Sequence, residues 1–276
     1  MHSKISTGLL ASLPLLTLTG CDSLLKALED SADGQMCLST VLELAGVTRD
    51  DLSAPGADEL LTATLIAQEA VIGEAYVVDC EAEESLSYLS GTSEGITTSV
   101  SGSGQLGGAL MDAVQDNSSK GMEVAILIDT TGSMRDDQEA VEEAVADIIA
   151  EVKENKGYLA MASYGDNQGC DEPEWYAIND GGLLDVSSGS SIVATETVLK
   201  TGVIETGGCN WPESMYDAVW ETATRLDWTG DNRRIIAITD ARPLEPPYTN
   251  HTSEEVREKL TELNVTLDTM LVGIVF

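Results

Sequence analysis

The clearest pattern in this chain is a short apolar run that is followed by an amphipathic stretch. Residues 124–128 are all apolar and rich in β-branched side chains, and polar residues follow them at once. A run of this length, bounded by turn residues, is typical of a strand that is buried on both faces of a parallel sheet. In residues 138–152 the apolar positions recur at helical spacing and the acidic positions occupy the other side, which predicts a helix.

The alternation of apolar strands and amphipathic helices continues to the carboxyl end of the chain. Further strands are predicted at residues 158–164, 175–178, 235–239 and 267–276, and further helices at 212–226 and 254–263. Pro212 is tolerated in the first turn of its helix, and Ser253 is the expected N-cap of the last one. This order predicts an α/β fold with a doubly wound, mostly parallel sheet and flanking helices.

The first 119 residues show weaker patterns and divide into three parts. Residues 1–20 form a candidate signal peptide, and residues 21–84 a small acidic segment with helical patterns. The second part is too short to bury a large core on its own. Residues 85–119 are rich in Ser, Gly and Thr, which predicts a flexible spacer with at most a short helix at 109–114. The sheet domain is expected at residues 120–276.

Polar side chains with oxygen donors follow the first buried strand of the sheet domain. Asp129, Thr131 and Ser133 stand at alternate positions directly after that strand. Open α/β sheets bind their ligands at the carboxyl ends of the strands, where these residues are expected. A carboxylate and two hydroxyls are hard donors, which suit Mg²⁺ or Mn²⁺ better than a metal that prefers thiolates.

The pattern D-x-T-x-S after a buried strand resembles the metal-ion-dependent adhesion site (MIDAS) of von Willebrand factor type A (VWA) domains. Three more motifs follow in the family's order. Residues 207–214 (GGCNWPES) resemble its glycine-rich loop, often G-G-G-D-x-P-E, and residues 235–241 (IIAITDA) resemble its fourth strand with the closing Asp240. Residues 164–166 (YGD) resemble the turn after its second strand. The resemblance covers roughly residues 120–276 and implies a VWA-type, Rossmann-like fold.

The resemblance also implies a set of metal ligands. The hydroxyls of Thr131 and Ser133 would coordinate the ion directly, whereas Asp129 and Asp240 would ligate it or accept hydrogen bonds from its bound waters. The last ligand would come from residues 206–210, where Asn210 replaces the family's aspartate, so that either Thr206 or Asn210 is a candidate. The expected ion is Mg²⁺, with Mn²⁺ or Ca²⁺ as alternatives. In the other interpretation, the loop only caps the next helix through Ser133 or Asp136.

The carboxyl end departs from the family pattern. A full domain of this type usually continues into one more strand and a C-terminal helix, and no such unit follows the predicted strand at 267–276. In integrin-type relatives that helix moves when the metal site changes state. The sequence therefore predicts a domain that lacks the last strand–helix unit, and a binding module without that switch.

The motifs favour binding over catalysis. The chain has no nucleotide-binding P-loop motif, and Ser163 has no G-x-S-x-G frame. His251 is the single histidine beyond the signal peptide, and we expect it to be solvated. We expect no enzymatic activity and no small-molecule substrate, but a metal-dependent protein-binding module in adhesion or envelope complex assembly, which binds a carboxylate of a protein partner. The alternative is a metal-dependent hydrolase that uses the same acidic site.

The charge of the chain is strongly negative. It has 48 acidic and 14 basic residues, which gives a formal net charge of −34. Such a surface repels nucleic acids and anionic lipid head groups, so we exclude both as partners. It attracts divalent cations, although a solvated acidic surface without a specific partner is a sufficient explanation of the charge itself.

The first residues predict export. A basic start with His2 and Lys4 is followed by an apolar core at residues 8–18, which is too short to span a bilayer. The tetrapeptide at residues 18–21 (LTGC) resembles the bacterial lipobox. The resemblance implies that Cys21 is lipidated and anchors an exported lipoprotein to the cell membrane, at its periplasmic face or at the cell surface. The alternative is an ordinary signal peptide with a chance cysteine.

Four cysteines remain after Cys21, an even number that suits an oxidising compartment. They permit three pairings. The simplest one stays within each region, as Cys37–Cys80 and Cys170–Cys209. The second bridge would stiffen loops at the rim of the metal site. Two unrelated buried thiols are the alternative for Cys170 and Cys209.

Overall fold

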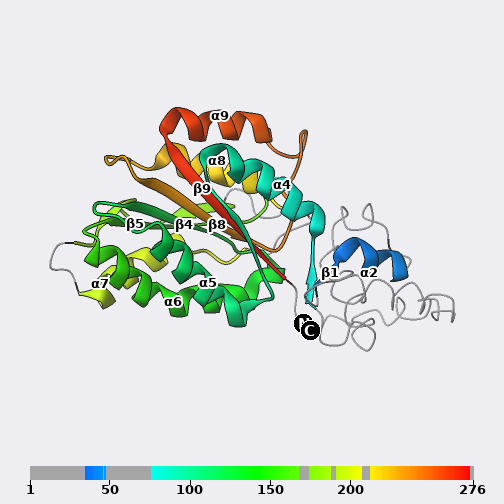
Figure 1. Cartoon of the computed structure of the whole chain (residues 1–276), viewed down its shortest axis with the longest axis horizontal. Helices are drawn as coiled ribbons and strands as arrows, with labels where there is room; N and C mark the ends of the chain where they lie inside the picture. The colour runs from blue at the N-terminus through cyan, green and yellow to red at the C-terminus, as the bar shows by residue number, and fades with distance from the viewer. Residues whose placement is uncertain are drawn as a thin grey trace, which may run out of the picture.

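The computed structural model describes residues 35–45, 47, 76–167, 174–187, 191–206 and 212–273, and these form a seven-stranded sheet with helices on both faces and a small unit beside it (Figure 1). The strands of the sheet are, in spatial order, β3 (Thr97–Val100), β9 (Val265–Val272), β8 (Arg233–Thr239), β4 (Glu123–Asp129), β5 (Tyr158–Tyr164) and β6 (Tyr176–Ile178), and β7 (Leu184–Asp185) also pairs with β5. From β3 to β5 the neighbours are parallel, whereas β6 and β7 run antiparallel to β5. The predicted α/β class with a mostly parallel sheet is confirmed.

Three helices cover each face of the sheet (Figure 1). One face carries α5 (Ser103–Asp116), α6 (Arg135–Glu154) and α7 (Ile192–Leu199), and the other carries α4 (Cys80–Ser90), α8 (Met215–Arg225) and α9 (Ser253–Leu263). Short 3-10 turns lie at η2 (Gly91–Ser93), η3 (Gly132–Met134) and η4 (Lys200–Gly202).

The apolar run of β4 is continuous because both of its faces are covered. Val124, Ile126 and Ile128 pack in the core under α5 and α6. The residues between them, Ala125 and Leu127, pack in the core under α4, α8 and α9. Side chains of a strand alternate between the faces, so a strand covered on both sides needs an apolar residue at every position.

Two helix starts differ from the prediction, each for a local reason. The helix expected from residue 212 begins at Met215, because Glu213 forms a strand-like bridge with Pro243. The N-cap of α9 is Thr252, not Ser253. The Thr252 hydroxyl accepts the amide of Glu255 at 3.2 Å, and the Glu255 carboxylate accepts the amide of Thr252 at 2.8 Å. This reciprocal capping box fixes the start of the helix.

The segment expected to be a flexible spacer, residues 85–119, contains the end of α4, η2, β3 and α5, so that prediction was wrong for residues 85–93, 97–100 and 103–116. β3 forms the edge strand beside β9, and α5 packs against α6. The expectation that no strand–helix unit follows the last strand is not contradicted, but β3 and α5 supply such a unit before β4 in the chain. The prediction failed because it relied on small residues as a sign of flexibility. At Gly107 an added side-chain carbon would lie 3.4 Å from the Ala140 carbonyl oxygen, so glycine permits close packing of α5 on α6.

The N-terminal part of the described chain forms a small unit beside the sheet domain (Figure 1). It consists of the parallel strands β1 (Gln35–Cys37) and β2 (Tyr76–Val78) with helix α2 (Leu38–Ala45). A disulfide joins Cys37 to Cys80, the first residue of α4, which confirms the predicted pair. No helix within the described ranges is long and apolar enough to cross a membrane.

The edge strand generates a prediction about Gly95, which precedes β3. A side-chain carbon at Gly95 would lie 1.7 Å from the carbonyl oxygen of Leu267 in β9. Gly95→Ala should therefore force β3 away from β9 and lower the free energy of unfolding by about 1–3 kcal/mol, measured by urea denaturation. Gly91→Ala is the matched control, because nothing lies within 4 Å of an added carbon there and the backbone is already helical. It should leave stability unchanged or raise it by up to about 1 kcal/mol. Equal effects of the two substitutions would contradict the packing at the β3 edge.

Candidate functional site

The candidate site lies where the parallel strands β4, β5 and β8 end. Asp129 is the last residue of β4, and Asp240 directly follows β8. The register of the sheet aligns these strands, with Ile128 opposite both Ser163 of β5 and Ile238 of β8. Side chains that follow the three strands therefore meet at one edge of the sheet, as the sequence predicted.

Asp129 is fully buried and held by hydroxyl groups on both sides. One carboxylate oxygen accepts the amide of Thr131 at 3.0 Å and its hydroxyl at 2.7 Å. The other accepts the hydroxyl of Thr239 at 2.8 Å. A threonine hydroxyl that donates its proton to a carboxylate keeps its lone pairs for another partner. Thr131 can therefore still act as an oxygen ligand.

Several buried oxygen atoms around Asp129 have no hydrogen-bond partner among the residues that the structure describes. They are Ser133 Oγ, Asp137 Oδ1, Asp240 Oδ1 and both carboxylate oxygens of Glu213. Buried polar atoms are almost always paired, because each unpaired one costs about 1–3 kcal/mol. A cluster of such atoms marks a place where a ligand or ion is expected.

The carboxylates of the site raise one another's pKa. Burial raises the pKa of Asp129 to about 6, against the hydrogen bonds from Thr131 and Thr239. Burial, with the nearby charge of Asp129, also raises the pKa of Glu213 and of Asp240 well above the usual range. The ion pairs of the described residues include none of these three carboxylates. Among the described residues, the site therefore gathers several acidic groups and no cationic side chain that pairs with them.

The structure brings together most, but not all, of the predicted site residues. Ser133 lies beside Asp240, and Asp240 in turn lies close enough to Asp129 for that charge to raise its pKa. Thr206 lies beside the same loop, where its hydroxyl is 3.2 Å from that of Thr130 and its amide donates to the Thr130 carbonyl at 3.3 Å. The remaining predicted residues, Cys21, Cys170, Cys209 and Asn210, lie outside the described residues.

Glu213 is the residue that sequence reasoning missed. It stands in the P-E part of the glycine-rich loop motif, but no role was assigned to it. Its amide donates to the Arg242 carbonyl at 3.0 Å, and its carbonyl accepts the Leu244 amide at 2.7 Å. This bridge holds the fully buried side chain close to Asp129, Asp166 and Asp240. The available signal in the sequence was an acidic residue directly after Pro212. Its role could not be inferred from position alone, because its neighbours in space come from three other parts of the chain.

A further buried carboxylate, that of Asp217 in α8, accepts several hydrogen bonds at the flank of the site. It accepts hydrogen bonds from Asn167, which follows Asp166, and from Thr249, Asn250 and His251. The Nδ1 atom of His251 lies 2.8 Å from Asp217, and the ring stacks on Trp220 at 4.1 Å between centroids. The expectation of a solvated His251 is therefore corrected: this histidine joins the loop to α8.

The donor set fits a hard cation held partly by hydroxyl groups. Within the described ranges, no three His, Cys, Asp or Glu side chains form a ready metal-binding group. The oxygens without partners, Ser133 Oγ and Asp240 Oδ1, are the donor types that Mg²⁺ prefers, and the excess of negative charge is what a divalent ion would balance.

No family model and no curated protein matches this chain. Among solved structures, two of the pilus adhesin SpaC from Lactobacillus rhamnosus GG are similar, one of them in an open conformation. Their sequence identities are 17% and 15%, and each has a TM-score of 0.35 over 45% of this chain. The matched part spans only 15% and 16% of the adhesin. A likeness this low carries no conclusion about family or function.

Asp137 at the edge of the cluster yields a prediction about pH. Burial, with the charges of Asp136 and Asp129, raises its pKa from 3.8 to about 7. A raised carboxyl pKa means that the folded state binds more protons than the unfolded one, so this contribution to stability is full below about pH 4 and is lost as pH rises to about 7. In the presence of chelator, the free energy of unfolding of wild type should fall as pH rises, and Asp137→Asn should make this fall smaller by on the order of 2 kcal/mol. Thermal unfolding between pH 4.5 and 7.5 measures it.

The matched control for this prediction is Glu139→Gln, an exposed position on the same helix. Both substitutions remove one negative charge, so general repulsion across the acidic surface changes equally in the two variants. If they flatten the pH profile to the same extent, Asp137 has no special environment.

Proposed function

We propose that this chain is an exported, lipid-anchored protein whose sheet domain binds a divalent cation and, through it, a carboxylate of a partner protein. The proposal joins the resemblance to VWA domains with the chemistry of the buried edge. It assigns the protein to adhesion or to the assembly of complexes at the cell envelope, and not to catalysis.

The observation that carries the proposal is the burial of three carboxylates with no counter-ion among the residues that the structure describes. Asp129 and Glu213 are 0% exposed and Asp240 is 2% exposed. Carboxylates buried in this way are strongly destabilising unless a cation or several hydrogen bonds compensate them. Among the described residues no cation pairs with Glu213, and its contact with the Asp166 carboxyl raises its pKa further; Asp240 has one oxygen without a hydrogen-bond partner among these residues. A divalent cation supplies the positive charge that the described residues do not provide here.

The proposed ligands follow from the contacts of each side chain. Thr131 and Ser133 offer hydroxyl oxygens, and Asp129, which binds the Thr131 hydroxyl, orients that ligand. Asp240 and Glu213 offer carboxylate oxygens from two other segments. Glu213 thus takes the place in the ligand set for which the sequence suggested Thr206 or Asn210. A hard cation in this set supplies positive charge to which an acidic side chain of a partner binds.

The remaining features suit a partner outside the cytoplasm. The lipobox-like tetrapeptide at residues 18–21 attaches the chain to a membrane, and the disulfide between Cys37 and Cys80 suits an oxidising compartment. The net charge of −34 disfavours nucleic acid and anionic lipid surfaces as ligands. The partner is therefore a protein that offers an acidic group to the bound ion.

The metal site predicts a specific gain of stability. Mg²⁺ or Mn²⁺ should raise the melting temperature of the chelator-treated chain, because an ion that binds only the folded state stabilises it by mass action. At a concentration of about a hundred times the dissociation constant the gain is about 2.7 kcal/mol. Asp240→Ala should abolish the response, and Glu213→Gln should weaken it. Without metal, both variants should be at least as stable as wild type, because they relieve repulsion between carboxylates.

Two controls separate a site from general screening of the acidic surface. NaCl at matched ionic strength reports screening alone, and Asp112→Ala removes an exposed carboxylate on α5. The Asp112 variant should respond to Mg²⁺ like wild type. If NaCl reproduces the whole stabilisation, or if the Asp240 variant responds normally, the chain has no specific metal site and the proposed function loses its mechanism.

The lipid anchor generates a separate prediction. A fatty-acid analogue supplied to bacteria that express the chain should label the wild-type protein but not Cys21→Ser, because the lipid is attached through the Cys21 side chain. Gel fluorescence after click coupling measures the label. Equal labelling of the two proteins would overturn the anchor without touching the metal site.

A further inference from the structure

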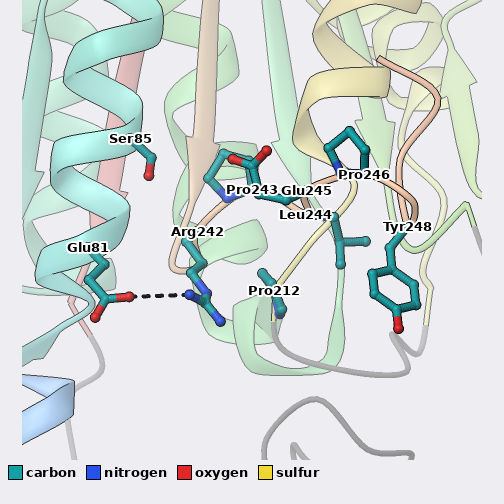
Figure 2. Close-up of a pocket in the computed structure, with 9 residues that line it drawn as sticks. All are labelled: Glu81, Ser85, Pro212, Arg242, Pro243, Leu244, Glu245, Pro246 and Tyr248. Atoms are coloured by element: carbon teal, nitrogen blue, oxygen red, sulfur yellow. Dashed lines mark hydrogen bonds and ion pairs between the residues drawn. The ribbon is translucent and has the colours of Figure 1, made fainter. Parts of the chain in front are cut away.

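A pocket of about 350 Å³ lies between α4 and the segment that follows β8. Figure 2 shows Glu81 and Ser85 of α4 on one side and residues 242–248 with Pro212 on the other. This volume is at the lower end of ligand pockets, which span ~300–1,000 Å³. The pocket therefore suits one long side chain better than a large cofactor.

Part of the pocket lining is apolar and rigid. Pro212, Pro243 and Leu244 are buried, and the Leu244 amide donates to the Glu213 carbonyl at 2.7 Å. Pro246 follows at an exposed position. A long basic side chain places its methylene groups on such a surface while its charged end stays in water. The apolar lining is therefore compatible with a basic side chain as well as with an apolar one.

The lining also carries a carboxylate whose charge is not balanced. Glu81 forms an ion pair with Arg242 at 3.2 Å, drawn in Figure 2. Glu245 is exposed and takes part in none of the ion pairs of the described residues. One of its oxygens accepts the hydroxyl of Tyr216 at 3.1 Å, and this neutral donor leaves the negative charge in place. A cation in the pocket would balance that charge, whereas an anion would be repelled by it and by the net charge of −34.

An accessible aromatic ring lies at the other end of the same turn. The Tyr248 amide donates to the Glu245 carbonyl at 3.0 Å, so these two residues close a β-turn and their Cα atoms lie within about 7 Å of each other. The Tyr248 side chain is 60% exposed, and the ring and cation–π contacts of the described residues do not include it. The turn thus offers a carboxylate and a ring face together.

Two other tyrosines of the chain show which group completes such a pair. Arg257 lies over the Tyr88 ring at 3.9 Å from its centroid, and the Tyr88 hydroxyl donates to Glu254 at 2.7 Å. Arg225 lies over the Tyr176 ring at 5.1 Å and also pairs with a glutamate of its own helix. In both places an arginine lies over a tyrosine ring that has a glutamate nearby. At the pocket the described residues supply the tyrosine and the glutamate, but the arginine of the lining pairs with α4 instead.

From these features we infer that the pocket binds an arginine side chain of a partner protein. Its methylene groups pack on the apolar lining, its guanidinium donates to the Glu245 carboxylate, and the guanidinium plane stacks on the Tyr248 ring. Arginine is favoured over lysine, because a planar guanidinium stacks on aromatic rings and is more weakly hydrated than an ammonium group. Free arginine is disfavoured, because its own carboxylate would meet the negative charge of the lining.

The test uses the whole chain in chelator and about 0.15 M NaCl, which screens exposed charges beyond about 8 Å. The probe is acetyl-Gly-Ala-Arg-Ala-Gly-amide, and the comparison ligands are the same peptide with citrulline, a neutral isostere, or with Lys, and free arginine. Amide NMR signals of Leu244 and Tyr248 should shift with the probe. The probe should bind about tenfold more tightly than the citrulline peptide and about threefold more tightly than the lysine peptide or free arginine.

Each comparison ligand tests one part of the inference. Absence of shifts, or equal binding of the arginine and citrulline peptides, would overturn the charge recognition. Equal binding of the lysine peptide would overturn the choice of arginine. Free arginine that binds as tightly as the probe would overturn the assignment to a partner protein.

A matched pair of charge substitutions places the contact. Glu245→Gln keeps an acceptor for Tyr216 but removes the charge, whereas Glu84→Gln removes the same charge at an exposed position of α4 that does not line the pocket. The first should weaken the probe about fivefold, and the second by less than about 1.5-fold. Equal losses would mean that the probe responds only to the general charge of the surface, and the inference would fall.

A second pair tests the ring. Tyr248→Phe keeps the aromatic face, whereas Tyr248→Leu replaces it with an apolar side chain, and the exposed position tolerates both. The leucine variant should bind the probe about threefold more weakly than wild type, and the phenylalanine variant should stay within about 1.5-fold. Equal affinities of the two variants would contradict stacking on the ring and with it the preference for arginine.

The inference goes beyond the proposed function, because this contact needs no metal ion. The probe carries no carboxylate, and Glu245 and Tyr248 lie outside the proposed ligand set, so their variants should keep the stabilisation by Mg²⁺. Binding of the probe together with no specific response to Mg²⁺ would retain the pocket and remove the metal site. No binding together with a normal response to Mg²⁺ would do the reverse.

Discussion

The parallel pairing of β4 with β5 on one side and β8 on the other is the constraint on which the rest of the structure depends. It buries every residue of β4 and ends the three strands at one level, so that Asp129 and Asp240 must share a small volume. Apolar burial along β4 stabilises the sheet, and the same pairing forces carboxylates together at its end. A strand slipped by two residues would preserve the apolar faces but separate the acids.

The burial of several carboxyl groups at one edge of the sheet lowers the stability of the fold there. Asp129, Glu213 and Asp240 all have raised pKa values because burial and mutual repulsion disfavour their charged forms. Hydroxyls of Thr131 and Thr239 compensate part of the cost at Asp129, but nothing comparable reaches Glu213 among the described residues. Residues that break the usual rules for a buried core are expected at functional sites, where the remaining cost is met by a ligand.

The sequence predicted the elements whose signal is local. The apolar runs at residues 124–128, 158–164 and 235–239 predicted β4, β5 and β8. The pairing of β4 with β8 then brings Asp129 close to Asp240. The sequence did not predict β3 and α5. Glycines along this segment suggest a flexible linker, but in the folded protein Gly95 and Gly107 allow close packing against neighbouring elements. The sequence missed Glu213 for a related reason: the bridge to Arg242 and Leu244 that positions this carboxylate joins segments about thirty residues apart.

That bridge also connects the acidic cluster to α4 through the segment that follows β8. The hydrogen bonds of Glu213 to the backbone of residues 242 and 244 fix its buried side chain against that segment. Arg242 of the same segment forms an ion pair with Glu81 of α4 at 3.2 Å, and the first residue of α4 is disulfide-bonded to Cys37. The backbone bridge, the ion pair and the disulfide therefore link the acidic cluster to the N-terminal unit.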